Sequence, residues 1–190
     1  ILTFSFLWFT YLGSKIGEVY IAANAILINL VFLSAFILDA YAFSTEGIIG
    51  FSIGKKNKAL FSEIVKNSFI LSSLTGLGIS ILYYFIHKNV IYMMSDINLV
   101  RSLSLDYSIW MIMLPFFASF CYQFDGIFIG ASQTKEIRNA MIVSVIGFIG
   151  ASIYLTDYFE NHGLWFSLML FMILRALTLK FYFNKILRKF

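Results

Sequence analysis

Charged residues, cysteine and histidine are all scarce in this chain, and each scarcity argues against a class of protein. Charged residues make up 13% of the 190 residues, whereas a soluble domain carries roughly a quarter. The two histidines lie far apart, the lone Cys121 lies within an apolar run, and the sequence shows no metal-binding cluster. It shows no phosphate-binding loop and no grouped serine, histidine and aspartate. We therefore expect neither a soluble protein nor an enzyme, and no bound cofactor.

Long apolar runs take the place of these features. The chain is 60% hydrophobic, contains 22 phenylalanines and has a mean hydropathy of +0.85. A transmembrane β-barrel would alternate polar and apolar residues over segments of about ten residues, and no such alternation is present. The composition, with its single proline, predicts an all-α integral membrane protein that crosses the lipid bilayer several times.

Six apolar segments define the expected helices. They cover about residues 1–12, 20–53, 69–94, 107–131, 137–158 and 164–183. The first segment is too short to span a bilayer at 1.5 Å per residue, so we expect a helix that is truncated at its start. The second is longer than a bilayer requires, which predicts a tilted or projecting helix.

Basic residues alternate between the two sets of connections. Ten of them follow the second, fourth and sixth segments, and three lie on the other side. Because basic residues concentrate in cytoplasmic loops, this bias predicts a multi-pass protein of the cell's inner (plasma) membrane with a cytoplasmic C-terminus. The same placement explains the net charge of +4 without a nucleic-acid partner.

Two connections carry a helical pattern of their own. Residues 55–66 are amphipathic and predict a helix on the cytoplasmic membrane surface. Residues 95–107 begin with a serine or aspartate cap and predict a short interfacial helix on the other side. Neither segment requires a function beyond connection.

Four charged residues interrupt the apolar segments: Asp39, Glu46, Asp125 and Arg175. Each costs about 2.5–3.5 kcal/mol at the bilayer centre on insertion scales, so such residues normally face a partner, a cavity or an ion path. Arg175 can form a structural ion pair with one carboxylate, for which Asp39 is a candidate. Three acids and one base then leave two acids over.

The surplus acids indicate a coupling site. Asp39 and Glu46 are seven residues apart, about 10 Å along one helix face, although Glu46 lies nearer the cytoplasmic end. Desolvation and a nearby like charge both favour the neutral form of a carboxyl group, so these acids must bind H⁺ or a cation such as Na⁺. An Asp125→Asn change is expected to leave expression nearly normal, because a protonated acid and an amide cost similar amounts to bury.

Two glycine pairs and one proline lie within the same apolar segments. Gly126 with Gly130, and Gly50 with Gly54, have the spacing that allows close helix packing, and we prefer this interpretation to ligand binding. Pro115 removes one backbone hydrogen bond and predicts a helix kink ten residues before Asp125. Kinked helices recur at transporter binding sites.

Three stretches in this order resemble the multidrug and toxic compound extrusion (MATE) family, in its DNA-damage-inducible protein F-like branch. They read "AANAILINLVFLSAFILDAYAFSTEGIIGFSIGKKN", "LPFFASFCYQFDGIFIGASQTKEIRNAM" and "GLWFSLMLFMILRALTL". They resemble the eighth, tenth and twelfth helices of that branch. One departure is Ala40–Tyr41, where the branch commonly has Gly and Phe.

The resemblance implies a six-helix C-terminal lobe of a twelve-helix, pseudo-symmetric transporter. A missing N-terminal lobe, upstream in the same chain, would be its partner. The implied function is export of small organic cations or other amphiphiles in exchange for H⁺ or Na⁺. By the same resemblance, Asp125 is the ion-coupling acid of the tenth helix, Asp39 and Glu46 are acids of the eighth, and Arg175 is the arginine of the twelfth.

Other functions stay open at this point. A flippase of lipid-linked oligosaccharides from the same superfamily would need more basic residues facing its cavity, and Arg175 is the one candidate. A structural membrane subunit would have no reason to bury surplus carboxylates, and a membrane-embedded enzyme would need a nucleophile or a metal set.

Overall fold

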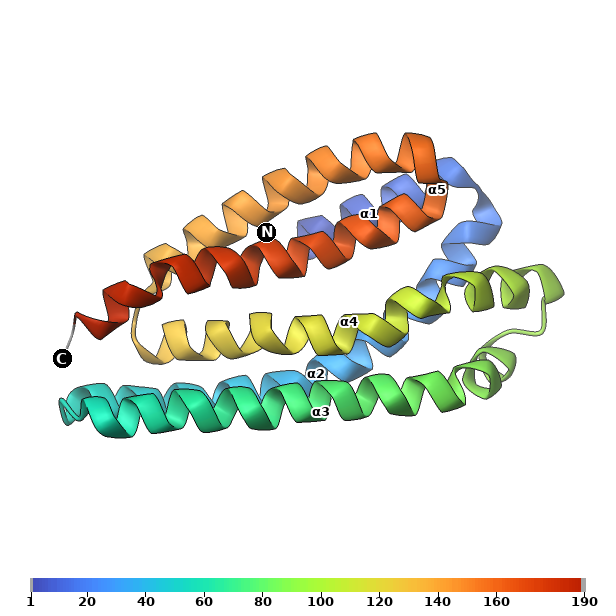
Figure 1. Ribbon diagram of the computed structural model, residues 1–190. Coiled ribbons are helices and arrows are strands. Elements are labelled where there is room, and N and C mark those ends of the chain that lie inside the picture. The colour runs from blue at the N-terminus through green and yellow to red at the C-terminus, as the bar shows by residue number, and fades with distance from the viewer. Residues whose placement is uncertain (1, 189–190) are drawn as a thin grey trace.

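The computed structural model describes residues 2–188, and these residues form five helices (Figure 1). Their bounds are α1 (Leu2–Ile16), α2 (Glu18–Gly54), α3 (Lys58–Met94), α4 (Asn98–Gly130) and α5 (Thr134–Leu187). Four of them, α2 to α5, are long and apolar enough to cross a membrane. The prediction of an all-helical membrane protein is confirmed, whereas the expected helix boundaries need two corrections.

Two predicted connecting helices are continuous with the long helices that follow them. The basic amphipathic segment predicted at 55–66 becomes the start of α3, and the interfacial segment predicted at 95–107 becomes the start of α4. Neither junction contains proline or glycine that would break the helix. Asn57 marks the true start of α3, because its side chain accepts a hydrogen bond from the Leu60 amide at 3.0 Å.

The fifth and sixth predicted helices form the two arms of α5. Helical geometry is interrupted at Glu160, whose φ of 48° and ψ of −129° lie outside the helical region. The chain reverses there, so the two arms run back alongside one another (Figure 1). Gly163 makes the reversal possible, since a side chain at this position would collide with the Leu155 carbonyl oxygen. The break lies between the two helices expected at 137–158 and 164–183, so the prediction of two separate helices is confirmed.

The helix ends at one end of the bundle share a turn geometry. After α2, Lys56 has a positive φ of 51° and the Asn57 amide bonds to the Ser52 carbonyl oxygen at 3.0 Å. After α4, Ser132 has a φ of 54° and the Gln133 amide bonds to the Phe128 oxygen at 2.9 Å. Both are Schellman-type ends, which satisfy terminal carbonyl groups and turn the chain sharply into the next helix.

The long helices place basic residues mainly at one end of the molecule. This basic end holds the α2–α3 and α4–α5 connections and the last turns of α5, while the opposite end holds the other connections and the α5 reversal (Figure 1). The basic residues at or near the basic end are Lys55, Lys56, Lys58, Lys66, Lys135, Arg138, Lys180, Lys185 and Arg188. Those toward the opposite end are Lys15, Lys88 and Arg101. Lys189, which also counted in the sequence bias, lies outside the described residues.

Glycine brings α2 and α4 into close contact. A side chain at Gly126 would collide with the backbone of Ala42, and one at Gly130 would collide with the backbone of Glu46. The close-packing interpretation of this glycine pair is confirmed. For the second pair it holds in part, because a Cβ on Gly54 would meet nothing within 4 Å.

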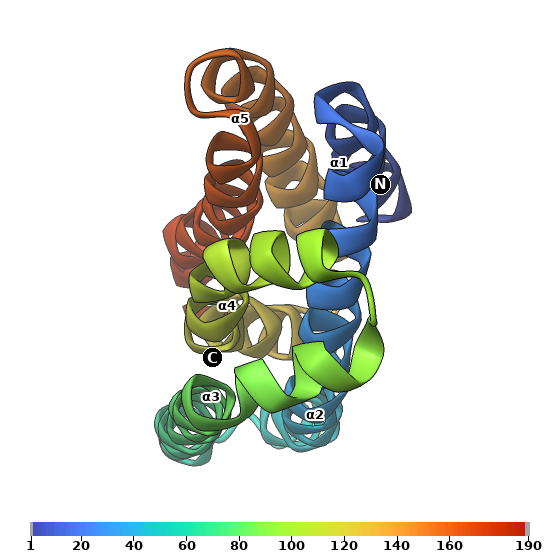
Figure 2. The ribbon, with the colours of Figure 1, turned by 90° about the vertical axis from the view of Figure 1, so that its right-hand side faces the viewer.

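Pro115 lies inside α4 without ending it. Its ring nitrogen cannot donate the hydrogen bond that a helix normally makes to the carbonyl of Met111. The proline carbonyl faces α3, where a Cβ on Gly76 would come within 2.8 Å of it. Figure 2 shows that the N-terminal part of α4 (green) runs crosswise to the rest of the helix. A bend in α4 thus accompanies a close contact with α3.

Candidate functional site

The charged groups of three helices meet inside the bundle. Arg175 on the second arm of α5 donates from Nη2 to Oδ2 of Asp125 on α4, at 2.6 Å. Both side chains are about nine-tenths buried, with 8% and 10% of their surface exposed. Such a short charge-assisted bond in a dry environment is strong once formed, but both ions have lost their hydration. The pair therefore connects α4 to α5 at a high cost in desolvation.

Some polar atoms of this cluster have no hydrogen-bond partner among the described residues. They are Oδ1 of Asp125 and Nε of Arg175. Buried polar atoms in proteins are almost always satisfied, and an unpaired one costs about 1–3 kcal/mol. One acceptor and one donor are thus available at the ion pair for a further ligand.

Asp39 is the second acid of the cluster. It lies on α2, is half-buried, and is close enough to Arg175 and Asp125 for electrostatic interaction with both. It forms no salt bridge within residues 2–188. Arg175 was expected to have Asp39 as a candidate partner, and the structure pairs it with Asp125 instead. Asp39 is consequently the surplus acid beside the pair.

Glu46 lies two turns further along α2, toward the basic end. Its side chain is half-buried, and its backbone supports the close contact with Gly130. No salt bridge to it is found in the described part of the chain. The structure therefore groups Asp39 with Asp125 and Arg175, and leaves Glu46 at the helix crossing.

Gln123 is a polar residue of this region that the sequence did not single out. It is fully buried and donates from Nε2 to Thr45 Oγ1 on α2 at 2.9 Å. Thr45 in turn donates to the Tyr41 carbonyl oxygen at 2.8 Å. An uncharged amide in an apolar run is a weak signal beside a carboxylate. Its place two residues before Asp125 was the one available indication.

A second polar cluster occupies the opposite end of the bundle. Asn24 on α2 and Asn161 on α5 exchange two hydrogen bonds, at 2.8 and 2.9 Å, and Trp165 Nε1 donates to Asn24 Oδ1 at 2.8 Å. All three side chains are buried. This amide cluster is neutral and its members satisfy one another, which is the pattern of a structural connection.

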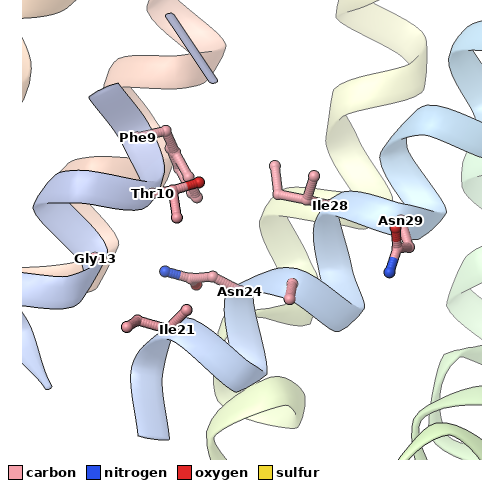
Figure 3. Close-up of a pocket in the computed structure, with 8 residues that line it drawn as sticks. Phe9, Thr10, Gly13, Ile21, Asn24, Ile28 and Asn29 are labelled. Atoms are coloured by element: carbon pink, nitrogen blue, oxygen red, sulfur yellow. The ribbon is translucent and has the colours of Figure 1, made fainter. Parts of the chain in front are cut away.

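A small pocket lies beside the amide cluster, between α1 and α2 (Figure 3). It has a volume of about 170 Å³, and Asn24 extends from α2 toward Gly13 on α1. Phe9 and Ile28 contribute apolar walls. None of the four charged residues that the sequence singled out lines this pocket, so it is separate from the charge cluster.

Long apolar helices that enclose a buried ion pair define a multi-span membrane protein. The sequence pattern of the MatE family matches residues 1–156, which is most of the chain, and the chain belongs to that family. It is also 31% identical over 170 residues to DNA damage-inducible protein F of Escherichia coli strain K12. That match covers 90% of this chain and 37% of the relative, so the chain spans about a third of the relative's length. Family membership makes transport the general expectation.

Proposed function

We propose that the chain is the C-terminal lobe of a secondary antiporter. It exports organic cations or other amphiphilic small molecules in exchange for H⁺ or Na⁺. The buried Asp125–Arg175 pair, with an unpartnered carboxylate oxygen, is the observation that carries this proposal. Removing both ions from water makes an ion pair a costly way to hold two helices together, and intramembrane ionisable residues usually mark a transport path.

The net charge of the cluster suggests how an ion could be coupled to transport. Asp125, Asp39 and Arg175 together carry one surplus negative charge in a low-dielectric interior. Binding of H⁺ or Na⁺ at Asp125 neutralises its carboxylate and weakens its attraction to Arg175. Arg175 is then able to turn toward Asp39. The pair is thus a two-state element whose equilibrium the coupling ion shifts.

The rest of the lobe converts this local change into motion. Asp125 lies one residue from Gly126, at the close contact between α2 and α4. A change in the pair acts directly on that crossing, and Pro115 provides a bend in the same helix. Rocking of this lobe against an N-terminal lobe would open a central cavity to each side in turn. We expect Glu46 to be a secondary acid on the same path.

The alternative functions make different demands. A flippase of lipid-linked oligosaccharides needs cationic groups free to bind phosphate, and Arg175 is engaged by Asp125. A structural membrane subunit needs the ion pair only as a staple. The antiporter is favoured because a staple explains neither the unpartnered Oδ1 nor the surplus Asp39.

Ion-coupled efflux by the natural full-length protein tests the proposal. The protein is reconstituted in liposomes, and efflux of a fluorescent organic cation is followed under imposed pH and Na⁺ gradients. Three variants are compared: Asp125→Asn, the double variant Asp125→Asn with Arg175→Gln, and Asp106→Asn, an exposed aspartate on the same helix as control. We expect the first two to lose the response to the gradient and the control to keep it.

The double variant tests whether the Asp125–Arg175 pair couples transport to an ion or only connects α4 to α5. Neutralising both partners removes the unpaired charge and should restore folding. If the double variant folds and still responds to the gradient as the parent does, the pair is only a staple and the antiporter mechanism through Asp125 is wrong. Asp39 or Glu46 would then be the coupling acid to test.

Orientation is a separate part of the proposal. We place the basic end in the cytoplasm and the protein in the inner membrane, because positively charged connections stay on the cytoplasmic side. A reporter that is active only outside the cytoplasm, fused after the last residue, should give no signal. A strong signal would invert the topology without affecting the charge cluster.

A further inference from the structure

A pocket of about 670 Å³ lies between the last turns of α1 and the first arm of α5, next to the α5 reversal. It is separate from the charge cluster of Asp125 and from the pocket in Figure 3. The polar and aromatic residues that line it are Trp8, Tyr11, Lys15, Thr156, Asp157 and Glu160. One cation and two carboxylates therefore face the same space.

These opposite charges do not pair with each other. No salt bridge involves Lys15, Asp157 or Glu160 within residues 2–188. All three side chains are exposed. Ions of opposite sign that line one pocket without contact are suited to a ligand that carries both signs at separate positions.

The aromatic residues of the pocket are already engaged. The Lys15 ammonium lies over the Tyr11 ring, 4.7 Å from its centre. Trp8 packs against Tyr11 at a centroid distance of 5.6 Å and donates from Nε1 to Ser152 Oγ at 3.0 Å. A quaternary ammonium group would need a free ring face for cation–π contact. The pocket is therefore better suited to a primary ammonium, which binds carboxylates through its own hydrogens.

Two local features of the pocket are the backbone at Glu160 and the hydroxyl of Thr156. Glu160 holds a left-handed φ of 48° with a ψ of −129°, a conformation that normally requires glycine. Such strain costs of order 1–3 kcal/mol and tends to occur at functional sites. Thr156 Oγ1 is buried at the pocket and has no partner among the described residues. The strain at Glu160 accompanies the chain reversal, whereas the unsatisfied Thr156 hydroxyl points to a missing polar ligand.

The pocket is placed where lipid headgroups meet the protein. Its tryptophan and tyrosine are the residues typical of the membrane–water boundary. Ile153 lines the pocket itself, and the exposed Leu7 and Tyr154 lie on the same two helices. A ligand with a zwitterionic head and apolar chains would match both the pocket and this flank.

We infer that the pocket between α1 and α5 binds the headgroup of an aminophospholipid, phosphatidylethanolamine. Its phosphate contacts Lys15, and its primary ammonium donates to Asp157, Glu160 and the Thr156 hydroxyl. Its acyl chains lie against the apolar flank of α1 and α5. This inference does not depend on ion-coupled transport through Asp125.

Native mass spectrometry of the full-length protein tests the site. The protein is equilibrated in detergent with equal amounts of phosphatidylethanolamine, phosphatidylcholine and phosphatidylglycerol that carry identical chains. We expect phosphatidylethanolamine to be retained about tenfold over phosphatidylcholine, a difference of about 1.4 kcal/mol. Lys15→Gln, and the double variant Asp157→Asn with Glu160→Gln, should each remove this preference. Lys88→Gln and Glu18→Gln, which change exposed charges toward the same end of the molecule, should keep it.

Each outcome decides the question. Equal retention of the three lipids in the parent protein overturns the inference, and preference for phosphatidylglycerol overturns the role of the carboxylates. Loss of preference in the two control variants would mean a diffuse surface effect and would also overturn it. Unchanged thermal unfolding of every variant shows that the fold is intact, since all five positions are exposed.

Discussion

The two buried polar clusters of this protein make opposite use of hydrogen bonding. In the amide cluster, Asn24 and Asn161 exchange two bonds and Trp165 adds a third. In the charge cluster, Asp125 and Arg175 share one short bond, yet each retains a buried polar atom that has no partner within residues 2–188. Both clusters connect α5 to another helix, so their difference is not one of topology.

The comparison teaches how to separate structure from function in a membrane bundle. A neutral cluster that satisfies its own groups gains rigidity and leaves nothing for a ligand. A charged cluster with unpaired hydrogen-bonding atoms lowers the stability of the fold, but those atoms can bind an ion. The predictions below test this contrast, from the largest expected effect to the smallest.

Removing one member of the ion pair should have the largest effect on stability. Asp125→Asn removes the direct partner of Arg175 and leaves only the half-buried Asp39 beside it, so we expect a loss of up to about 3–5 kcal/mol in the free energy of unfolding. This replaces the expectation from sequence that the change is nearly neutral. The measurement is thermal unfolding in detergent. Addition of Arg175→Gln should recover most of the loss, and a single variant as stable as the parent would show that the Asp125–Arg175 pair does not stabilise the fold.

Opening the amide cluster should have a smaller effect and no effect on ion coupling. Asn161→Leu leaves Asn24 Nδ2 without its partner, and we expect a loss of about 1–3 kcal/mol. Fluorescence of the fully buried Trp165 should report the change. Asn89→Leu, at an exposed asparagine, is the control and should be close to neutral. A gradient response that changes with Asn161 would remove the distinction between the two clusters.

The glycine crossing beside the charge cluster should be sensitive to a single methyl group. Gly126→Ala places a Cβ against the backbone of Ala42, and we expect a loss of about 1–3 kcal/mol from overpacking. Gly54→Ala is the matched control, because a Cβ there meets nothing within 4 Å. Equal unfolding temperatures for the two variants would contradict the close contact of α2 with α4.

The smallest expected effect is a gain in stability at the α5 reversal. Glu160→Gly removes the strain of a left-handed residue, and the benefit should exceed the entropic cost of glycine by about 1 kcal/mol. Glu160→Gln keeps the Cβ and should give no gain. Thermal unfolding of the two variants side by side measures the difference. A loss of stability with glycine would show that the turn is held by contacts of the side chain.

Several helix ends were difficult to locate from the sequence because hydropathy marks the apolar core of a helix and not its termini. The polar residues at the start of α3 and of α4 were interpreted as separate surface helices, but a helix continues through polar residues when nothing breaks it. The Asn57 cap was the available signal for the start of α3. The reversal at Glu160, by contrast, lies in the gap between the helices predicted at 137–158 and 164–183, although no glycine occupies the strained position.

The ion pair shows the limit of sequence reasoning for the site. The sequence identified Asp39, Asp125 and Arg175 as charges in apolar segments, because each stands out against its neighbours. The choice of partner for Arg175 depends on how α2 and α4 approach the second arm of α5. Gly126 and Gly130 set one part of that arrangement, because their missing side chains bring the α2 and α4 backbones together.

Composition and hydropathy by themselves determined that this protein is a bundle of helices in a membrane. The position of a charged residue within an apolar segment identified the candidates for the functional site. These properties depend on each segment's own free energy of transfer from water to lipid. Only the tertiary structure decided that Arg175 binds Asp125, that Asn24 binds Asn161, and that Lys15 and Glu160 line one pocket. Each of these pairs joins residues more than 40 positions apart, so distances between packed helices decide them, and no local periodicity records those distances.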